Sequence, residues 1–193
     1  MYARSVDGKV LTFGVSGLLY KSNVLMYDHQ TESLWSQVRR EAVTGPMTGT
    51  RLKVLSSTLT AWAKWKKRHP ETKVLSIKTG YVRDYSRDPY EDYYKSRKGF
   101  LALFKPAPGE EEKQLVAGIA IDGSMKAYPL DHLREKGRLT DRLGDTSITL
   151  VFDPKTDVLS VRDAKGNEVP HVVLYWFVWK GINPGSDLFR PGK

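Results

Sequence analysis

Apolar and polar residues alternate over short stretches along most of the chain, a pattern that predicts β-strands with one buried face. Turn residues such as Asp7-Gly8 and Asp122-Gly123 separate these stretches, which suits antiparallel hairpins. Too little helix alternates with strand for a doubly wound parallel sheet. The predicted fold class is therefore mainly β (α+β), with antiparallel sheets and a few short helices. The expected strands are KVLTFGV (9–15), NVLMYD (23–28), SLWSQV (33–38), EAVTG (41–45), RLKVLS (51–56), LVAGIAI (115–121), SITLVFD (147–153) and VLSVRD (158–163).

Helical spacing occurs mainly around the tryptophans. Trp62 and Trp65 lie three residues apart, on one face of a predicted helix that Pro70 ends. The stretch HVVLYWFVW (171–179) is apolar on every side, so it is either a buried helix or a strand, and its likeness to the first tryptophan segment favours a helix. Residues 129–139 predict one further short helix. We expect Trp62, Trp65, Trp176 and Trp179 to anchor their helices against a sheet face.

The chain contains an internal similarity that predicts a duplication. TAWAKWKKRHPETKVL (60–75) resembles LYWFVWKGINPGSDLF (174–189), with two Trp three apart, Lys directly after the second, and Pro four residues later. SVDGKVLTF (5–13) resembles AIDGSMKAY (120–128), and VLMYDHQTESLW (24–35) resembles TLVFDPKTDVLS (149–160). Three ordered matches predict two pseudo-symmetric repeats. We expect a first repeat over 1–79, a connection over 80–114 and a second repeat over 115–193, together in one compact domain.

Charge is distributed unevenly. The formal net charge is +9, and residues 1–105 hold 19 Lys and Arg against 9 Asp and Glu, whereas residues 106–193 hold 12 against 13. A basic face attracts polyanions without specificity. The partner is therefore unknown, with a polyanion as one candidate for the basic first half. The candidate polyanion-binding residues are Lys64, Lys66, Lys67 and Arg68.

Several kinds of chemistry have no support in the sequence. Cysteine is absent, which excludes disulfides and thiol catalysis, and the four histidines are too scattered for a metal site, so we expect neither a metal nor another cofactor. GVSGL around Ser16 lacks the last glycine of a nucleophile elbow, and its glycines favour a β-bulge. The longest apolar run has eight residues, far below the roughly 20 of a membrane span. The start lacks an apolar signal, so we expect a cytoplasmic protein.

Residues 80–99 are rich in tyrosine and in charges of both signs. Few aliphatic residues are available for burial there, which is typical of a solvated connection that continues through Pro106 to Glu112. Tyrosine together with arginine also suits a binding loop, because the rings stack and the guanidinium groups contact anions. The candidate ligand contacts in this loop are Tyr81, Arg83, Asp84, Tyr85 and Tyr90.

The stretch LTFGVSGLLYKSNVLMYDHQTESLWSQ (11–37) closely resembles an uncharacterised prokaryotic family, the domain of unknown function numbered 3179. The resemblance continues through GTRLKVLSSTLTAWAKWKKRHPETKVLS, TGYVRDYSRDPYEDY, VAGIAIDGSMKAYPL and YWFVWKGINPGSDLF, and covers most of the chain. Two residues depart from the family pattern: His29 stands where Arg is expected and Asn23 where Asp is expected.

The resemblance implies a shared pocket and no established activity. Family members often continue upstream into a Cys-Pro-x-Cys segment, which this sequence lacks, and many are exported, which allows an exported protein if the chain is trimmed from a longer one. The candidate residues for the common pocket are Ser16, Tyr20, Asp28, Trp35, Gln37, Tyr81, Arg83, Asp84 and Tyr85.

Three function hypotheses remain open from the sequence. The first is a binding or scaffold domain with a ligand cleft between the two repeats, under the tyrosine-rich loop. The second is a hydrolase that acts on a polyanionic or sugar-like substrate with Asp28, Gln37, Arg83 and Asp84 as first candidates, so whether the chain is an enzyme is uncertain. The third is a non-specific nucleic-acid-binding protein that uses the basic first half.

Overall fold

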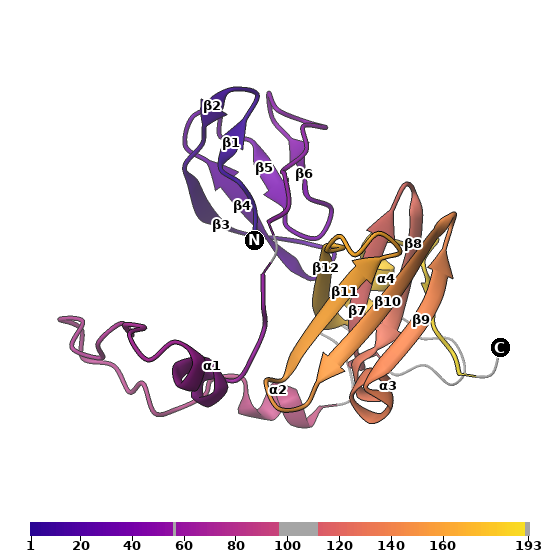
Figure 1. Cartoon of the computed structure of the whole chain (residues 1–193). Coiled ribbons are helices and arrows are strands. Elements are labelled where there is room, and N and C mark those ends of the chain that lie inside the picture. Colours follow the sequence, from indigo (N-terminus) through magenta and orange to yellow (C-terminus); the bar gives the residue numbers. More distant parts are fainter. Residues whose placement is uncertain (56, 97–111, 192–193) are drawn as a thin grey trace.

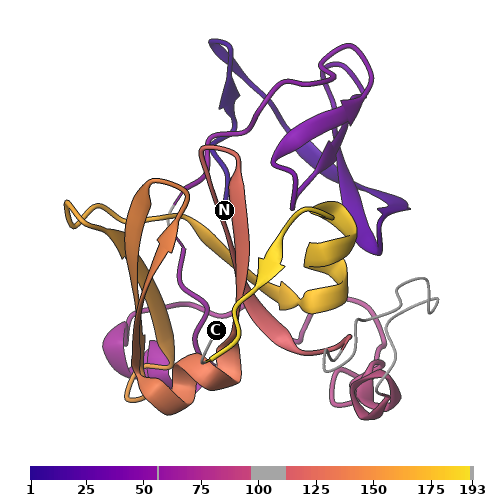
Figure 2. The same cartoon turned by 90° about the vertical axis from the view of Figure 1, so that its right-hand side faces the viewer.

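The computed structural model describes residues 1–55, 57–96 and 112–191 (Figures 1 and 2). Its described residues confirm a mainly β fold with antiparallel sheets and a few short helices. One short pairing, between β13 and β8, is parallel. The chain builds separate sheets before and after the tyrosine-rich loop. From here on, the first half means residues 1–55 and the second half means residues 112–191.

The first half is a consecutive meander around one buried indole. After the hairpin of β1 and β2, the sheet has the order β3-β4-β5-β6, and every neighbouring pair is antiparallel. Trp35 is completely buried at its centre, together with Val6, Leu11 and Leu52. The strands are β1 Ser5–Val6, β2 Lys9–Val10, β3 Phe13–Tyr20, β4 Asn23–Asp28, β5 Leu34–Ser36 and β6 Glu41–Thr44.

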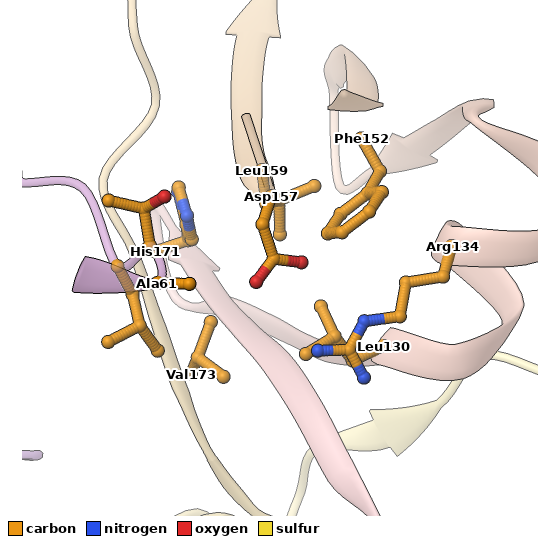
Figure 3. A pocket seen from close by; sticks show the side chains of 10 residues that line it. Ala61, Leu130, Arg134, Phe152, Asp157, Leu159, His171 and Val173 are labelled. Carbon is orange, nitrogen blue, oxygen red and sulfur yellow. The ribbon is translucent and has the colours of Figure 1, made fainter. Parts of the chain in front are cut away.

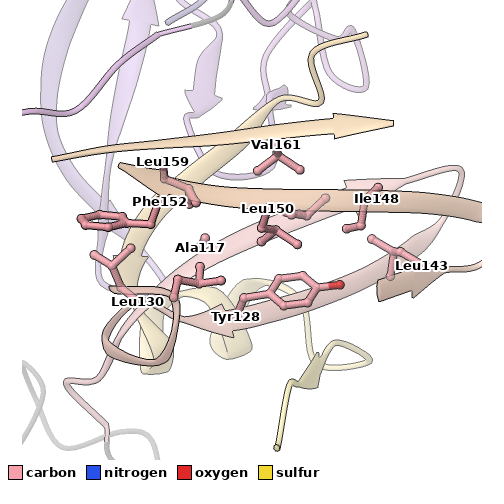
Figure 4. Packing of buried hydrophobic residues seen from close by; sticks show 11 residues of the cluster. Ala117, Tyr128, Leu130, Leu143, Ile148, Leu150, Phe152, Leu159 and Val161 are labelled. Atoms are coloured by element: carbon pink, nitrogen blue, oxygen red, sulfur yellow. The ribbon is translucent and has the colours of Figure 1, made fainter. Parts of the chain in front are cut away.

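The second half packs two sheets over a larger core. One sheet has the order β12-β7-β8-β13 and the other β11-β10-β9. Alternate residues of β10, such as Ile148 and Leu150, point into the space between the sheets, where they meet Tyr128 and Val161 (Figure 4). The strands are β7 Leu115–Ile121, β8 Ser124–Pro129, β9 Arg138–Leu143, β10 Thr146–Asp153, β11 Val158–Asp163, β12 His171–Tyr175 and β13 Asp187–Leu188, and helix α3 is Leu130–Lys136.

The apolar stretch 171–179 is strand first and helix afterwards. Its start forms β12, which pairs with β7, and helix α4 runs over Trp176–Ile182. The prediction of a helix over this whole stretch was wrong at its start, because β-branched residues there complete the edge of the sheet beside β7. Trp176 and Trp179 are 1% exposed, as expected, and pack with Val116 and Ala127.

Helix α4 also joins the two halves. Val38 of the first half packs against the clusters that hold Trp176, Trp179 and Phe177. In Figure 2 the yellow helix lies between the sheet of the second half and the indigo and violet strands of the first half.

The first tryptophan helix has the same local geometry as α4. Helix α1 runs over Trp62–Arg68, as predicted, and α1 and α4 both have seven residues that begin at a Trp. The indole of Trp65 donates to Thr72 Oγ1 over 3.0 Å, and that of Trp179 donates to Ser186 Oγ over 2.7 Å, in each case seven residues later. These parallels agree with a duplication, which remains a prediction about the origin of the chain.

The surroundings of the two helices differ. Helix α1 has no buried residue, and Trp62 is 49% exposed. The expectation that Trp62 and Trp65 anchor this helix on a sheet was therefore wrong. The chain before α1 leaves the first half and contacts a turn of the second half, where Thr60 Oγ1 donates to the Thr156 carbonyl. From α1 itself, Lys64 Nζ donates to Pro154 O of the same turn over 2.8 Å.

Other expectations met mixed outcomes. Of the predicted strand at 51–56, residues 51–55 form only isolated bridges, at Arg51 and Val54, and residue 56 lies outside the described residues. Strand β9 was not predicted, since charged residues dilute its alternation. Within the tyrosine-rich loop a short helix, α2, covers Glu91–Lys95. The predicted linker at 106–111 lies outside the described residues, and the repeat and domain boundaries stay predictions.

Replacement of Gly118 by Ala tests the packing of α4. A Cβ at Gly118 would lie 2.3 Å from Trp179 Cε3, so the buried indole has to move. We expect a loss of about 2–3 kcal/mol in the free energy of unfolding from overpacking. The matched control is Gly181→Ala in α4, where a Cβ meets open space and Ala favours the helix by up to about 1 kcal/mol. Urea denaturation measures both; equal midpoints for Gly118→Ala and the wild type would contradict the packing described.

Candidate functional site

A cavity of about 260 Å³ lies between the chain segment 59–61 and the second half (Figure 3). We call it the ligand cavity. Residues from four separate parts of the chain meet there: the segment before α1, helix α3, the β10–β11 hairpin, and β12. Its lining residues are Leu59, Thr60, Ala61, Leu130, Arg134, Phe152, Asp157, Leu159, His171 and Val173.

A hydrogen-bonded turn builds one wall of the ligand cavity. The carboxylate of Asp153 accepts hydrogen bonds from Lys155 N over 2.8 Å and from Thr156 Oγ1 over 2.7 Å. Asp157 follows with φ of 56°, a conformation that Asp tolerates better than most residues, and its N–H donates to Asp153 O over 2.8 Å. The carbonyls of residues 154 and 156 point outward and hold the segment 60–64. The turn therefore fixes both Asp157 and the segment facing it.

The floor of the ligand cavity is formed by one edge of the core of the second half. Leu130, Phe152 and Leu159 are buried members of that core, and Val173 of β12 packs against it. Because these side chains are already held by the two sheets, the floor is rigid and apolar. An apolar body of a ligand would find a preformed surface there.

Three titratable side chains face the same space. In Figure 3 the Asp157 carboxylate projects to the centre of the ligand cavity, and the Arg134 guanidinium approaches from the opposite side. The Asp157 carboxylate makes no hydrogen bond or ion pair with any other residue that the structure describes. Arg134 pairs with Asp131 over 3.1 Å and lies 5.7 Å from the Phe152 ring centre. Burial lowers the pKa of His171, so its imidazole is neutral at pH 7.

This arrangement favours the recognition of a cation. An ionised carboxylate above an apolar floor attracts an ammonium group more strongly than it would in bulk water. Neutral His171 contributes a ring nitrogen to the lining of the cavity. Arg134 contributes a positive charge, opposite in sign to that of the Asp157 carboxylate. The cavity therefore presents a carboxylate, a neutral imidazole and a guanidinium beside an apolar floor.

The predicted candidates in the first half are held by local contacts. Ser16 lies at a β-bulge between β3 and β4, where its hydroxyl donates to Leu25 O over 2.7 Å. The side-chain amide of Gln37 donates to Val24 O over 3.3 Å, and the backbone carbonyl of Gln37 accepts a hydrogen bond from the hydroxyl of Tyr2. Tyr20 ends β3 beside Arg39.

Asp28 and Trp35 form a structural pair in the first core. Both are completely buried. Trp35 Nε1 donates to Asp28 Oδ2 over 2.8 Å, and Thr31 donates to the same carboxylate through its hydroxyl and its backbone N–H. Burial acts to raise the pKa of Asp28, but these hydrogen bonds outweigh it and lower the pKa below 3.8. The Asp153 turn repeats this pattern without an indole donor.

The remaining candidates lie elsewhere. The loop residues Tyr81, Arg83, Asp84, Tyr85 and Tyr90 are exposed. Arg83, Asp84 and Tyr85 line an open pocket within the loop itself, with Arg87 and Pro89. Figure 1 places this loop and the sheet that carries Ser16 and Asp28 in different parts of the molecule. Lys64, Lys66, Lys67 and Arg68 are on α1. The predicted candidates therefore lie in three separate parts of the chain and do not form one site.

Sequence reasoning missed the residues of the ligand cavity. Asp157 had a partial signal, because DPKTD matches the Asp28 turn and places an acid after it. No sequence pattern indicated Arg134 or His171. The cavity forms only because the segment 59–61 crosses to the second half, and that contact cannot be read from local sequence.

The fold is that of a mainly antiparallel β protein with a cavity beside its larger core. The chain belongs to a family whose model, described as a protein of unknown function (DUF3179), matches residues 1–186. No curated protein and no solved structure matches the chain significantly. Among the described helices none has the length and apolar character that crossing a membrane requires. The described residues contain no group of three or more His, Asp or Glu placed to hold a metal ion.

Replacement of Asp28 by Asn tests whether this residue is structural. The amide cannot accept hydrogen bonds from Trp35 and Thr31 on both of its atoms, so a buried donor loses its partner. We expect a loss of about 3 kcal/mol in the free energy of unfolding at pH 7. The matched control is Asp153→Asn in the second turn, which lacks the buried indole and should lose less. Urea denaturation distinguishes them; an unchanged stability of Asp28→Asn would contradict the structural role.

The same carboxylate predicts a pH dependence. Because the pKa of Asp28 is lower in the folded than in the unfolded chain, the folded chain binds fewer protons. Its stabilisation is present above the ordinary pKa of 3.8 and is lost as the pH falls toward the folded pKa. We expect the stability difference between wild type and Asp28→Asn to shrink from about pH 5 to about pH 3. A constant difference would show that Asp28 contributes no charged-state stabilisation.

Proposed function

We propose that the protein is a binding domain for a small amphiphilic cation, which the ligand cavity holds by its ammonium group and its apolar body. The observation that carries the proposal is the Asp157 carboxylate, which faces an apolar floor without a hydrogen-bond or ion-pair partner among the described residues. The sequence predicted a ligand cleft between two repeats. The ligand cavity fits that idea, with walls from segment 59–61 and from the second half, but its lining does not include the tyrosine-rich loop.

The size of the cavity supports a small ligand. A volume of about 260 Å³ lies just below the roughly 300 to 1,000 Å³ that is usual for ligand pockets. A single ring or a short aliphatic chain with one amine would contact Phe152, Leu159 and Val173 while its ammonium group approaches Asp157. Arg134 at the rim would repel a second positive charge and favours ligands with one amine.

The experiment compares two probes of equal shape and opposite charge. Phenethylamine and hydrocinnamate are added at millimolar concentration to isotope-labelled protein, and amide chemical shifts are followed by NMR. We expect phenethylamine to shift resonances of residues around Asp157, Leu159 and His171. Hydrocinnamate should bind about tenfold more weakly, a difference of roughly 1.4 kcal/mol.

Two substitutions separate the cavity from general charge effects. Asp157→Asn keeps the left-handed backbone conformation, which Asn tolerates, and should weaken phenethylamine binding about tenfold. Asp122→Asn is the matched control, because Asp122 also has a positive φ in a hairpin turn but does not line the cavity. If phenethylamine leaves all resonances of the cavity unmoved, or if both variants bind it as the wild type does, the proposed function is wrong.

A further inference from the structure

Apolar side chains are unusually exposed in and around α1, in the part of the chain that projects from both halves (Figure 1). We call residues 59–83 the projecting segment. Trp62 on α1 is about half exposed, and Leu75 beyond it is 89% exposed. Soluble surfaces tolerate single exposed apolar residues, but a concentration of them marks a contact with another surface. The exposed large apolar residues of the segment are Leu59, Trp62, Val74, Leu75, Ile77, Tyr81 and Val82.

The projecting segment is also strongly basic. It holds seven Lys and Arg against one acidic residue, Glu71. Lys64 and Lys66 bond to backbone carbonyls. The other cations, Lys67, Arg68, Lys73, Lys78 and Arg83, form no ion pair with residues that the structure describes. A surface that covers this segment must therefore supply negative charge.

We propose that the projecting segment binds the surface of an anionic lipid bilayer. Lysine and arginine next to a negatively charged leaflet attract its headgroups, and tryptophan and tyrosine are favoured at the level of the headgroups. The aliphatic side chains Val74, Leu75 and Ile77 enter the apolar boundary below the headgroups, as the apolar face of an interfacial segment does. A nucleic acid would use the same cations but would leave these aliphatic side chains in water.

The inference does not depend on the ligand cavity, because Lys67, Arg68, Val74, Leu75 and Ile77 are not part of its lining. It also has the advantage that α1 has no buried residue, so substitutions there leave both cores intact. Trp35, Trp176 and Trp179 are buried, whereas Trp62 and Trp65 are the accessible indoles. Quenchers placed in the lipid therefore report on α1.

The test uses the whole chain with vesicles of phosphatidylglycerol and phosphatidylcholine, and with vesicles of phosphatidylcholine alone. We expect sedimentation with the anionic vesicles, at least tenfold weaker binding to the neutral ones, and weaker binding as salt is added. Brominated acyl chains should quench tryptophan fluorescence only in the anionic vesicles.

Paired variants separate the electrostatic and the apolar contributions. K67E/R68E should abolish the binding, and L75S/I77S should weaken it about tenfold while leaving it sensitive to salt. R138E/K165E, an equal charge change on exposed residues of the second half, is the matched control and should bind as the wild type does. Circular dichroism confirms that each variant is folded.

Three outcomes would overturn the inference. The first is no sedimentation with anionic vesicles at low salt. The second combines two results: L75S/I77S binds the vesicles as the wild type does, and the wild type binds mixed-sequence DNA tightly while K67E/R68E does not. Together they would assign the segment to nucleic acid. The third is equal binding of R138E/K165E and K67E/R68E, which would show that net charge alone is responsible.

Discussion

The burial of Trp179 over Gly118 is the contact on which the second half depends. Only a residue without a side chain allows the indole to approach β7 so closely, and the indole N–H then bonds to Ser186 just before β13. This one side chain thus connects α4, the centre of the sheet and its far edge. Since β12 leads directly into α4, the same contact sets the place of β12, and with it His171 and Val173 of the ligand cavity.

A turn of five residues has the corresponding role on the other side of the cavity. Asp153 satisfies the backbone of the turn with its own carboxylate, which leaves the carbonyls of residues 154 and 156 available for the segment 60–64. Local hydrogen bonding within a hairpin therefore produces a tertiary contact between distant parts of the chain. The first turn, at Asp28, uses its carboxylate differently, because a buried indole takes one of the acceptor positions.

The sequence was informative where local rules decide the structure. Alternation located most strands, Asp-Gly pairs located the β1–β2 and β7–β8 hairpins, and Pro70 predicted the end of α1, which stops at Arg68. It failed where tertiary packing decides. The likeness of the two tryptophan segments misled for Trp62, which is exposed whereas Trp176 is buried. The two helices share the backbone conformation of their caps, but the residues around Trp62 are mostly charged and those around Trp176 are mostly apolar. The strand at 171–175 exists because β7 offers a free edge, and the cavity exists because residues 59–61 cross to the second half.

The contrast between the two tryptophan helices has a consequence for how the chain can change over generations. Substitutions in α4 alter the core of the second half and are restricted by stability. Helix α1 repeats the motif but supports neither core. Selection for folding therefore places little restriction on its surface residues, and variation can accumulate there at little thermodynamic cost. A region of this kind is where related chains can acquire different binding preferences while they keep the same architecture.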